Sequence, residues 1–424
     1  MAHQADSGGT TMKGRPAADD TAQPPATLSF ADILAPIAPE RFFATYHGRQ
    51  CLHVPGAADK FAAVMSWARL NELLNLSAIW TNHSFEMALD GAFLPARDYC
   101  RPGLDHGTGA AALQPDPERV TALFKSGASL LLNDVDTLNP GLAAVARALE
   151  EVLESRVQAN LYCSSHEHQA FPTHFDTHDV YALHVEGEKL WRIYDGRLDD
   201  PVEHPSFKGQ PAAFHEKSRG RIVAEILLKP GDLLYIPRGT YHDAIARTAG
   251  TIHVAFGAVA VIGLDLVSHL FERAVSEPAF RRDFPRRHGP GGAEAFNRHL
   301  RGLAERLAAL AGDGQTAAAL RDFQDRYRYP RGGFALSETM LGAPGYRLAG
   351  DGFSVVRRGD AWALRRAGQA TAIPLGMEGA VGWIVGRREF AGDEFATAFA
   401  ALSAERRQDI LRALETMGVI VKTV

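Results

Sequence analysis

The first part of the chain changes from polar residues to apolar residues at helical spacing. Residues 1–28 are rich in Ala, Gly, Asp, Thr, Pro and Gln and almost lack large apolar side chains, which predicts a disordered tail. From Phe30 onward, apolar residues recur three or four positions apart, so short helices are expected up to Tyr46. A short strand is expected at 51–54, and Ser66 is a candidate N-cap for the helix after it.

The middle of the chain carries the pattern of many short strands. Apolar runs are separated by Gly, Pro, Asn and Asp, and one helix is predicted among them at about 140–154. Strands are expected at 128–132, around 160–162, from 179 through a hairpin at 186–187, at 222–228 and on both sides of 237–239. The segment 201–218 is expected to be a loop. Closely spaced short strands with turn signals are typical of a jelly roll, an architecture that cupins share.

The last third of the chain returns to helical spacing and then alternates. From Val261 onward, three helices are predicted. Their apolar positions lie within 262–275, 296–310 and 318–327. After Gly332 the pattern predicts short strands at 353–358 and 362–366, helices around 394–402 and 404–417, and a last strand at 419–424. The predicted fold class is therefore mainly β with α additions.

Composition and charge narrow the class of protein. With 424 residues and 46% hydrophobic content, the chain can build more than one packed domain. A net charge of −5 argues against binding of polyanions by charge alone. Two basic pairs, Arg357-Arg358 and Arg365-Arg366, lie near the C-terminus, but acidic residues nearly balance the basic ones over 336–424. Nucleic acid is therefore not expected as a partner, and a solvated or protein-docking face is favoured there.

The cysteines and the start of the chain predict a compartment. Cys51, Cys100 and Cys163 are far apart and form no C-x-x-C pair, which fits a reducing environment. The N-terminus lacks a charged start followed by an apolar stretch, and no run of about eighteen apolar residues occurs. A soluble, cytoplasmic protein without membrane attachment is expected.

Candidate chemistry is concentrated in the strand-rich region. His174 and Asp176 are two residues apart in a segment patterned for strands, so both side chains are expected on one face. His242 follows a predicted strand and turn and could supply a third ligand. Two histidines and one carboxylate form the ligand set of non-haem Fe(II) oxygenases. A His-x-Asp triplet is expected roughly once by chance in a chain of this length, so the context must carry the assignment.

Lys189 is the most informative part of that context. Strand alternation places it on the same side as Trp191 and Ile193, the side expected to be covered. A lysine facing an apolar interior is costly unless an anion meets it, and the carboxylate of a ligand near the metal would be such an anion. A lysine that reaches out to water from a hairpin is the plainer alternative. For the metal, a site of four histidines without Asp176 also stays open.

Several blocks of the sequence together resemble a known family. They are Asn160-Leu-Tyr162, His174-Phe-Asp176, Leu183 through Gly187 and Lys189 to Arg192, and Gly231-Asp232 through Ile236-Pro237-Arg238-Gly239 to His242. The chain resembles the JmjC family of 2-oxoglutarate oxygenases, and within it the ribosomal oxygenase subgroup, whose members hydroxylate ribosomal proteins. The resemblance is specific over about 160–257. It implies a double-stranded β-helix of the JmjC and cupin type.

The resemblance also implies roles for single residues. His174, Asp176 and His242 match the iron ligands, and Lys189 matches the lysine that pairs with the far carboxylate of 2-oxoglutarate. The remaining matches concern the co-substrate pocket: Asn160 and Tyr162 line it, His253 lies one residue short of a pocket histidine, and Gly257 stands where a small hydroxyl residue is expected. The implied cofactors are Fe(II), 2-oxoglutarate as co-substrate, and O2.

The resemblance divides the chain into segments. They are a tail at 1–28, a catalytic domain at 29–260, a helical dimerisation domain at 261–335 and a winged-helix-like domain at 336–424. A homodimer is expected, with a helical cap on the chain's own barrel as the alternative for 261–335. The expected activity is hydroxylation of an amino-acid side chain in a ribosomal protein or in a biosynthetic precursor peptide. A non-catalytic cupin-like module that docks a partner, or a metal hydrolase, are the alternatives.

Overall fold

A computed structural model describes residues 28–104, 109–165, 169–331, 344–358, 361–366, 368–373 and 377–423. The expected tail at 1–28 lies outside these residues except for Leu28. The chain forms two compact units, one ending at Arg331 and the other running from Gly332 to Val424. A further division at residue 260 stays a prediction.

The first unit is built on two antiparallel sheets. The larger has the order β1-β11-β8-β13-β7-β6-β2-β3, and the smaller has the order β10-β9-β12. The strands of the larger sheet are β1 (Leu52–Val54), β2 (Phe85–Leu89), β3 (Ala92–Phe93), β6 (Ser129–Leu132), β7 (Ser155–Ser164), β8 (Asp179–Glu186), β11 (Leu233–Ile236) and β13 (Thr251–Ala260). Those of the smaller sheet are β9 (Lys189–Arg197), β10 (Ile222–Leu228) and β12 (Thr240–Ala246). A separate hairpin joins β4 (Cys100–Leu104) and β5 (Ala111–Pro115).

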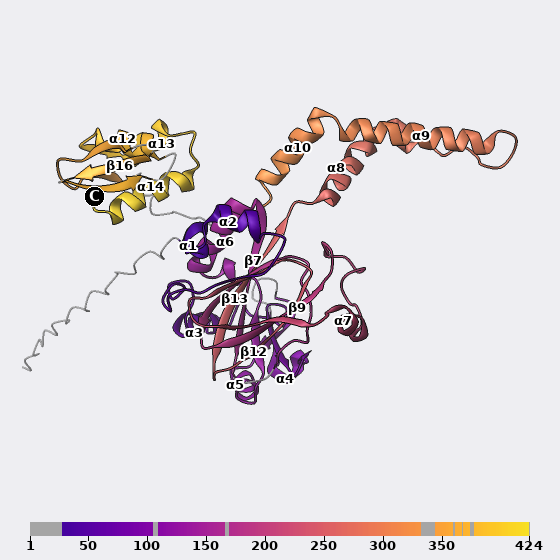
Figure 1. Cartoon of the computed structure of the whole chain (residues 1–424), viewed down its shortest axis with the longest axis horizontal. Helices are drawn as coiled ribbons and strands as arrows, with labels where there is room; N and C mark the ends of the chain where they lie inside the picture. Colours follow the sequence, from indigo (N-terminus) through magenta and orange to yellow (C-terminus); the bar gives the residue numbers. More distant parts are fainter. Residues whose placement is uncertain are drawn as a thin grey trace, which may run out of the picture. The chain divides into compact units, whose positions relative to one another are not determined.

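Helices cover one face of the larger sheet. They are α1 (Phe30–Leu34), α2 (Pro39–Thr45), α3 (Trp67–Leu74), α4 (Ala96–Tyr99), α5 (Pro117–Lys125), η1 (Val135–Thr137) and α6 (Pro140–Leu153). Figure 1 shows α1 and α6 together beside β7 and β13. Side chains of β8 alternate between two cores: Tyr181 and Leu183 pack with the helices, whereas Val180 and Ala182 pack with residues of the smaller sheet. The larger sheet is therefore buried on both faces, and the site lies on its second face.

The N-terminal helices and the capping of α3 match the sequence pattern. The Ser66 hydroxyl accepts a hydrogen bond from the Arg69 amide, as expected for an N-cap. The predicted loop at 201–218 is wrong in its last part, because Ala212–Ser218 form helix α7. Phe214 packs there beside Phe175 and Tyr241, and this tertiary packing is what the local sequence did not reveal.

Helices follow the last strand of the barrel. They are α8 (Gly263–Val275), η2 (Pro278–Arg281), α9 (Gly292–Ala311) and α10 (Gly314–Asp325). Arg273 of α8 donates to Asp313 at 2.8 Å and so ties α8 to the start of α10. No helix among the described residues is both long and apolar enough to cross a membrane.

The second unit has its own apolar core. Its strands are β14 (Gly345–Leu348), β15 (Ser354–Arg358), β16 (Ala361–Arg366), β17 (Gln369–Ile373), β18 (Glu389–Ala391) and β19 (Ile420–Thr423). Its helices are α12 (Glu378–Val385), α13 (Gly392–Ala398) and α14 (Ala404–Thr416). The strands form two three-stranded sheets, and side chains such as Ile384, Phe395 and Ile410 fill the core. The strands β14, β17 and β18 and helix α12 had no expected counterpart.

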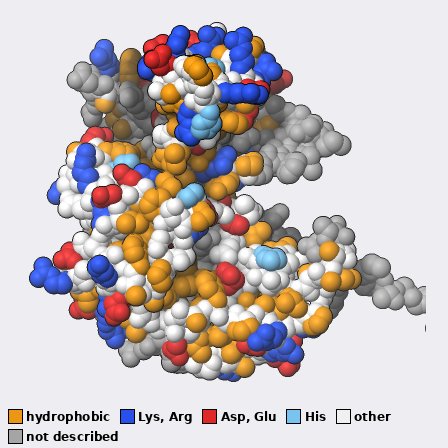
Figure 2. Space-filling model, turned by 90° about the vertical axis from the view of Figure 1, so that its right-hand side faces the viewer, with side chains coloured by type: hydrophobic (Ala, Val, Ile, Leu, Met, Phe, Trp, Pro, Cys, Tyr) orange, Lys and Arg blue, Asp and Glu red, His pale blue; other side chains and the backbone are white. Residues whose placement is uncertain are grey.

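The mainly β fold class with helical additions is thus confirmed. The charged surface is mixed, as the near balance of acidic and basic residues suggests. On the face drawn in Figure 2, acidic and basic side chains are interspersed and apolar side chains lie between them.

Candidate metal centre

Backbone pairing brings the first candidate ligands together. His174 lies in the segment between β7 and β8, and His242 lies in β12. Their backbones form an isolated antiparallel bridge, with N–H···O distances of 3.1 Å and 2.8 Å. The backbone carbonyl of Asp176 accepts a hydrogen bond from the backbone N–H of Gly239 at 2.9 Å. Asp176 is therefore held by the turn that precedes β12.

The turn before β12 requires a glycine. Gly239 has a φ of +81°, and a Cβ atom there would come within 2.0 Å of the Leu198 carbonyl oxygen. Only glycine adopts this conformation without strain. The Pro-Arg-Gly stretch in the sequence therefore marks the turn that aims His242 into the site.

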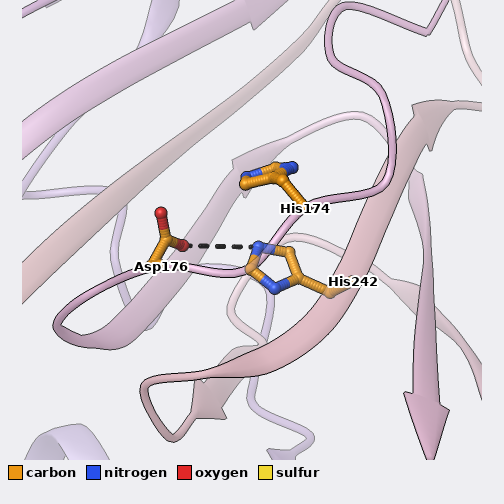
Figure 3. A group of neighbouring side chains, drawn as sticks. All are labelled: His174, Asp176 and His242. Atoms are coloured by element: carbon orange, nitrogen blue, oxygen red, sulfur yellow. Dashed lines mark ion pairs between the residues drawn. The ribbon is translucent and has the colours of Figure 1, made fainter. Parts of the chain in front are cut away.

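Three side chains converge as Figure 3 shows. One ligand atom from each of His174, Asp176 and His242 lies within 4.8 Å of the other two. Nε2 of His242 is 3.5 Å from Oδ2 of Asp176, and the two imidazole rings are 4.6 Å apart between centroids. Donor atoms gathered at this separation can bind a single ion between them.

Hydrogen bonds at Nδ1 fix the tautomers of both imidazoles. Nδ1 of His174 is 2.9 Å from the carbonyl oxygen of Pro172, and Nδ1 of His242 is 3.0 Å from that of Thr240. A carbonyl can only accept, so each Nδ1 carries the hydrogen and each Nε2 presents its lone pair. Hydrogen bonding of this kind orients metal-bound histidines in proteins. The residues present therefore fit a metal ion.

The protonation states also suit a cation. Burial lowers the pKa of His242 to about 4, with His174 acting in the same direction, so its imidazole is neutral at neutral pH. Burial alone would raise the pKa of Asp176, but His178, His174 and His242 together hold it below the ordinary value. A neutral imidazole and an ionised carboxylate are the forms that bind metals.

A pocket of about 340 Å³ surrounds the three side chains. One wall is formed by the neighbouring strands β7 and β13 of the larger sheet, and the smaller sheet contributes Lys189 and Trp191. Lys189 is 5% exposed and faces the same side of β9 as Trp191, as strand alternation predicts. Among the described residues no acidic group forms an ion pair with it. Burial lowers its pKa to about 8, although Cys163 acts in the opposite direction.

The residues assigned to the co-substrate by family resemblance line the same pocket. Tyr162 and His253 are paired across β7 and β13, and their rings stack at 4.8 Å with an interplanar angle of 7°. The side-chain oxygen of Asn160 accepts a hydrogen bond from the Asp134 amide at 3.2 Å. Nδ1 of His253 is buried and has no partner among the described residues. These polar atoms face a space that a ligand with oxygen atoms could fill, but their roles stay predictions.

His178 is a site residue that the sequence did not identify. It lines the pocket, and a Cβ atom at Gly257 would come within 2.6 Å of its ring. Gly257 of β13 therefore makes room for His178, which lies directly before β8. Its even spacing from His174 was visible in the sequence, but residues 175–178 form no strand, so this spacing alone did not give the direction of the ring.

The other histidines of the region divide between described and undescribed residues. His184 is fully buried, and its Nε2 is 2.9 Å from the Gly187 carbonyl oxygen, so a hairpin contact occupies it. His166 and His168 lie outside the described residues. Among the described residues, His174, Asp176 and His242 are the group whose donor atoms converge.

Known proteins match the same part of the chain. A family model described as "JmjC domain" matches residues 137–265. The bifunctional lysine-specific demethylase and histidyl-hydroxylase NO66 of Drosophila willistoni is 24% identical over 327 residues, 73% of this chain and 40% of the relative. Ribosomal oxygenase 1 of Rattus norvegicus is 28% identical over 222 residues, 52% of this chain and 34% of the relative. The chain thus matches less than half the length of these relatives.

A solved structure of similar fold supports the architecture. The Escherichia coli ribosomal oxygenase YcfD, in complex with cobalt and 2-oxoglutarate, superposes with a TM-score of 0.50 at 18% sequence identity. The superposition covers 92% of this chain and 99% of the other. At this identity the likeness establishes the fold.

Proposed function

We propose that this protein is an Fe(II)- and 2-oxoglutarate-dependent oxygenase of the JmjC family, whose domain model matches residues 137–265. The expected product is a hydroxylated amino-acid side chain in a protein or peptide. One observation carries the proposal. The pocket that gathers His174, Asp176 and His242 also contains Lys189, a buried cation that no acidic side chain neutralises among the described residues.

Three of these residues would bind the metal, and the fourth, Lys189, would bind the co-substrate. His174, Asp176 and His242 would hold Fe(II) on one side and leave its other positions open, as this ligand set does in oxygenases. Lys189 would bind the far carboxylate of 2-oxoglutarate, because burial without a partner makes its ammonium group a strong site for an anion. When bound, iron with O2 and 2-oxoglutarate supplies the oxidising power for hydroxylation, with succinate and CO2 as the other products.

The remaining pocket residues shape the space around that centre. Trp191 stacks near His242 at 5.8 Å and meets His253 edge to face at 5.4 Å, so aromatic rings line the interior. The backbone bridge between His174 and His242 keeps the two imidazoles in position before any ligand arrives.

Succinate formation is the direct test. The purified protein, Fe(II) and 2-oxoglutarate should yield succinate in air, and Asp176→Ala should abolish it. Asp322→Ala is the matched control, because Asp322 lies on α10 and is paired with Arg326 on the surface. Activity that persists without O2 or 2-oxoglutarate would point to a metal hydrolase instead. Absence of succinate from wild-type protein would favour a non-catalytic docking module.

The substrate class needs a separate experiment. The named relatives include a histidyl-hydroxylase and a ribosomal oxygenase, which supports a ribosomal protein as substrate. Ribosomal proteins and candidate precursor peptides should be incubated in parallel with enzyme, iron and 2-oxoglutarate. A mass gain of about 16 daltons, one oxygen atom, on either group identifies the class.

We also propose that the protein forms a homodimer through α8. Four apolar side chains lie on one stripe of this helix and are exposed: Leu264, Val267, Phe271 and Val275. Leu320 and Phe323 of α10 line a surface hollow together with Val267 and Phe271 of α8. The exposed apolar side chains and this apolar hollow thus lie on one surface, and two copies of that surface can pack against each other across a two-fold axis. Sedimentation should give a dimer mass, and Phe271→Asp should give a monomer. A monomeric wild type would leave α8 as a cap on its own chain.

The cytoplasmic location is a proposal of the same kind. Cys51, Cys100 and Cys163 are free thiols, which supports a reducing compartment. Fractionation of cells that express the tagged full chain tests it.

A further inference from the structure

The pocket wall contains a row of side chains from β7. Tyr162, Asn160, Gln158 and Arg156 alternate with buried core residues and all line the pocket. Across the ladder they pair with His253, Ala255, Gly257 and Val259 of β13. His253 is 3% exposed and Val259 is 43% exposed, so the row runs from the interior to the mouth. Arg156 ends it at the mouth.

Arg156 is held there by two aromatic rings. Its guanidinium carbon is 4.3 Å from the ring centre of Tyr327 and 5.6 Å from that of Tyr329, and Tyr329 lines the same pocket. Both tyrosines follow α10, about 170 residues further along the chain than Arg156. Aromatic faces stabilise the cation but do not satisfy its N–H donors. The edge of the guanidinium remains available for hydrogen bonds.

Arg156 lacks a protein anion. Its Nε is buried without a hydrogen-bond partner, and no described acidic side chain forms an ion pair with it. The other charged residues at the mouth, Glu203 and Lys208, pair with each other. Two cations that line the pocket therefore have no ion-pair partner among the described residues: Lys189 inside and Arg156 at the mouth.

A buried cluster fixes the tyrosines that hold Arg156. Arg331 donates to Oδ2 of Asp136 at 2.8 Å and also pairs with Glu150, and we call these three residues the Arg331 cluster. Oε1 of Glu150 accepts from the backbone N–H of Tyr329 at 3.2 Å. The segment that carries Tyr327 and Tyr329 is thus anchored to the barrel, and Arg156 is presented in a fixed position.

We propose that Arg156 is a specificity-determining residue that binds a carboxylate of the peptide substrate. The proposal deepens the proposed function and rests on it. A planar guanidinium with fixed donors matches a carboxylate in a two-point hydrogen bond, which its two terminal nitrogens can form. The carboxylate can come from an Asp or Glu side chain or from the C-terminus of the peptide. Arg156 lies four residues beyond Asn160 on β7, about 13 Å along the strand, so the acidic group should be a few residues from the modified one.

The test is selection of peptides by the full-length protein. Randomised short peptides, each pool made with either an amide or a free carboxylate at the C-terminus, are passed over protein loaded with Mn(II) and 2-oxoglutarate without O2. Retained peptides are sequenced by mass spectrometry. The wild type should enrich Asp and Glu over Asn and Gln about tenfold in amidated pools if a side chain is bound. Preference for free-acid pools alone identifies the C-terminal carboxylate.

Variants at the same position make the test decisive. Arg156→Gln should lose the preference, and Arg156→Glu should select Lys and Arg instead. Arg156→Lys should keep a weaker preference for acids, which shows that a loss in the other variants is not misfolding. Arg97→Glu is the matched control, since Arg97 is exposed and outside the pocket, and should select as the wild type does.

Two results would overturn the inference. One is a wild type that retains peptides without enriching acidic groups, and the other is the same enrichment in wild type and Arg156→Glu. Succinate assays separate this from the proposed function. A protein that forms succinate but shows no acidic preference contradicts the role of Arg156 alone, whereas acidic selection without succinate contradicts the oxygenase activity alone.

Discussion

Two groups of buried charges in the first unit differ in one respect. In the Arg331 cluster the guanidinium is 3% exposed and both of its carboxylate partners belong to the same chain. In the pocket Lys189 is 5% exposed and no described acidic side chain pairs with it. Both groups are costly to bury, but only the first recovers that cost within the fold. Removal of one member of the paired group leaves a buried charge uncompensated, whereas the unpaired Lys189 can be compensated by an anionic ligand.

The largest expected effect on stability comes from removing the cation of the Arg331 cluster. Arg331→Met leaves Asp136 and Glu150 buried without their cation, and the free energy of unfolding should fall by about 3–5 kcal/mol. Urea denaturation measures the change. Arg326→Met serves as control, because its partner Asp322 is exposed on the same helix and the loss should stay near 0.5 kcal/mol. A loss below about 1 kcal/mol in Arg331→Met would contradict a stabilising role.

The same change in the pocket should have the opposite consequence. Lys189→Met removes an unpaired buried charge, so the free energy of unfolding should stay the same or rise. The affinity for 2-oxoglutarate should fall by about 2–3 kcal/mol, roughly 100-fold. Calorimetry on metal-loaded protein measures both quantities. Lys208→Met is the control, because Lys208 also lines the pocket but is paired with Glu203. Equal losses in both variants would place the anion elsewhere.

Titration of Lys189 sharpens the comparison further. Its pKa of about 8 in the free protein means that its ammonium form is lost as the pH rises through 8. The bound diacid requires that form, so the affinity for 2-oxoglutarate should be flat below pH 8 and fall by up to about tenfold per pH unit above it. Lys189→Met should show no such fall. A wild-type affinity that is constant to pH 10 would contradict the assignment.

The smallest expected effect concerns the room left for His178. Gly257→Ala places a Cβ atom 2.6 Å from the His178 ring, which must move aside. The expected cost is about 1–2 kcal/mol of unfolding free energy, from local repacking. The binding of 2-oxoglutarate should weaken with it if the ring shifts into the pocket. Thermal denaturation and calorimetry separate the two effects, and an unchanged melting temperature would show that the ring moves freely.

The sequence revealed what periodicity and residue chemistry encode locally. The alternation around Lys189 follows from strand geometry, and the structure gathers His174, Asp176, Lys189 and His242 in one pocket. The strand expected at His174 and Asp176 is wrong, because only an isolated bridge forms at His174 and Asp176 lies in irregular backbone before β8. Helix α7 and the strands β14, β17 and β18 of the second unit were missed because a few residues carry too little periodicity to be recognised.

Contacts between distant segments were beyond a reading of the sequence. Arg156 meets Tyr327, and Arg331 meets Asp136, across more than 160 residues of chain. Neither pair has a local pattern, because the packing of the whole unit decides which side chains meet. His178 is an intermediate case, since its even spacing from His174 was visible but its direction depended on the strand that faces it.

The ladder between His174 and His242 has a consequence for how the protein acquires its ion. Two main-chain hydrogen bonds, rather than the ion, set the distance between these donors. The donors can therefore be in place before any metal ion binds, and binding of the proposed Fe(II) would be a later, reversible step. A chelator would then remove the activity without unfolding the protein, and adding the metal ion back would restore the activity.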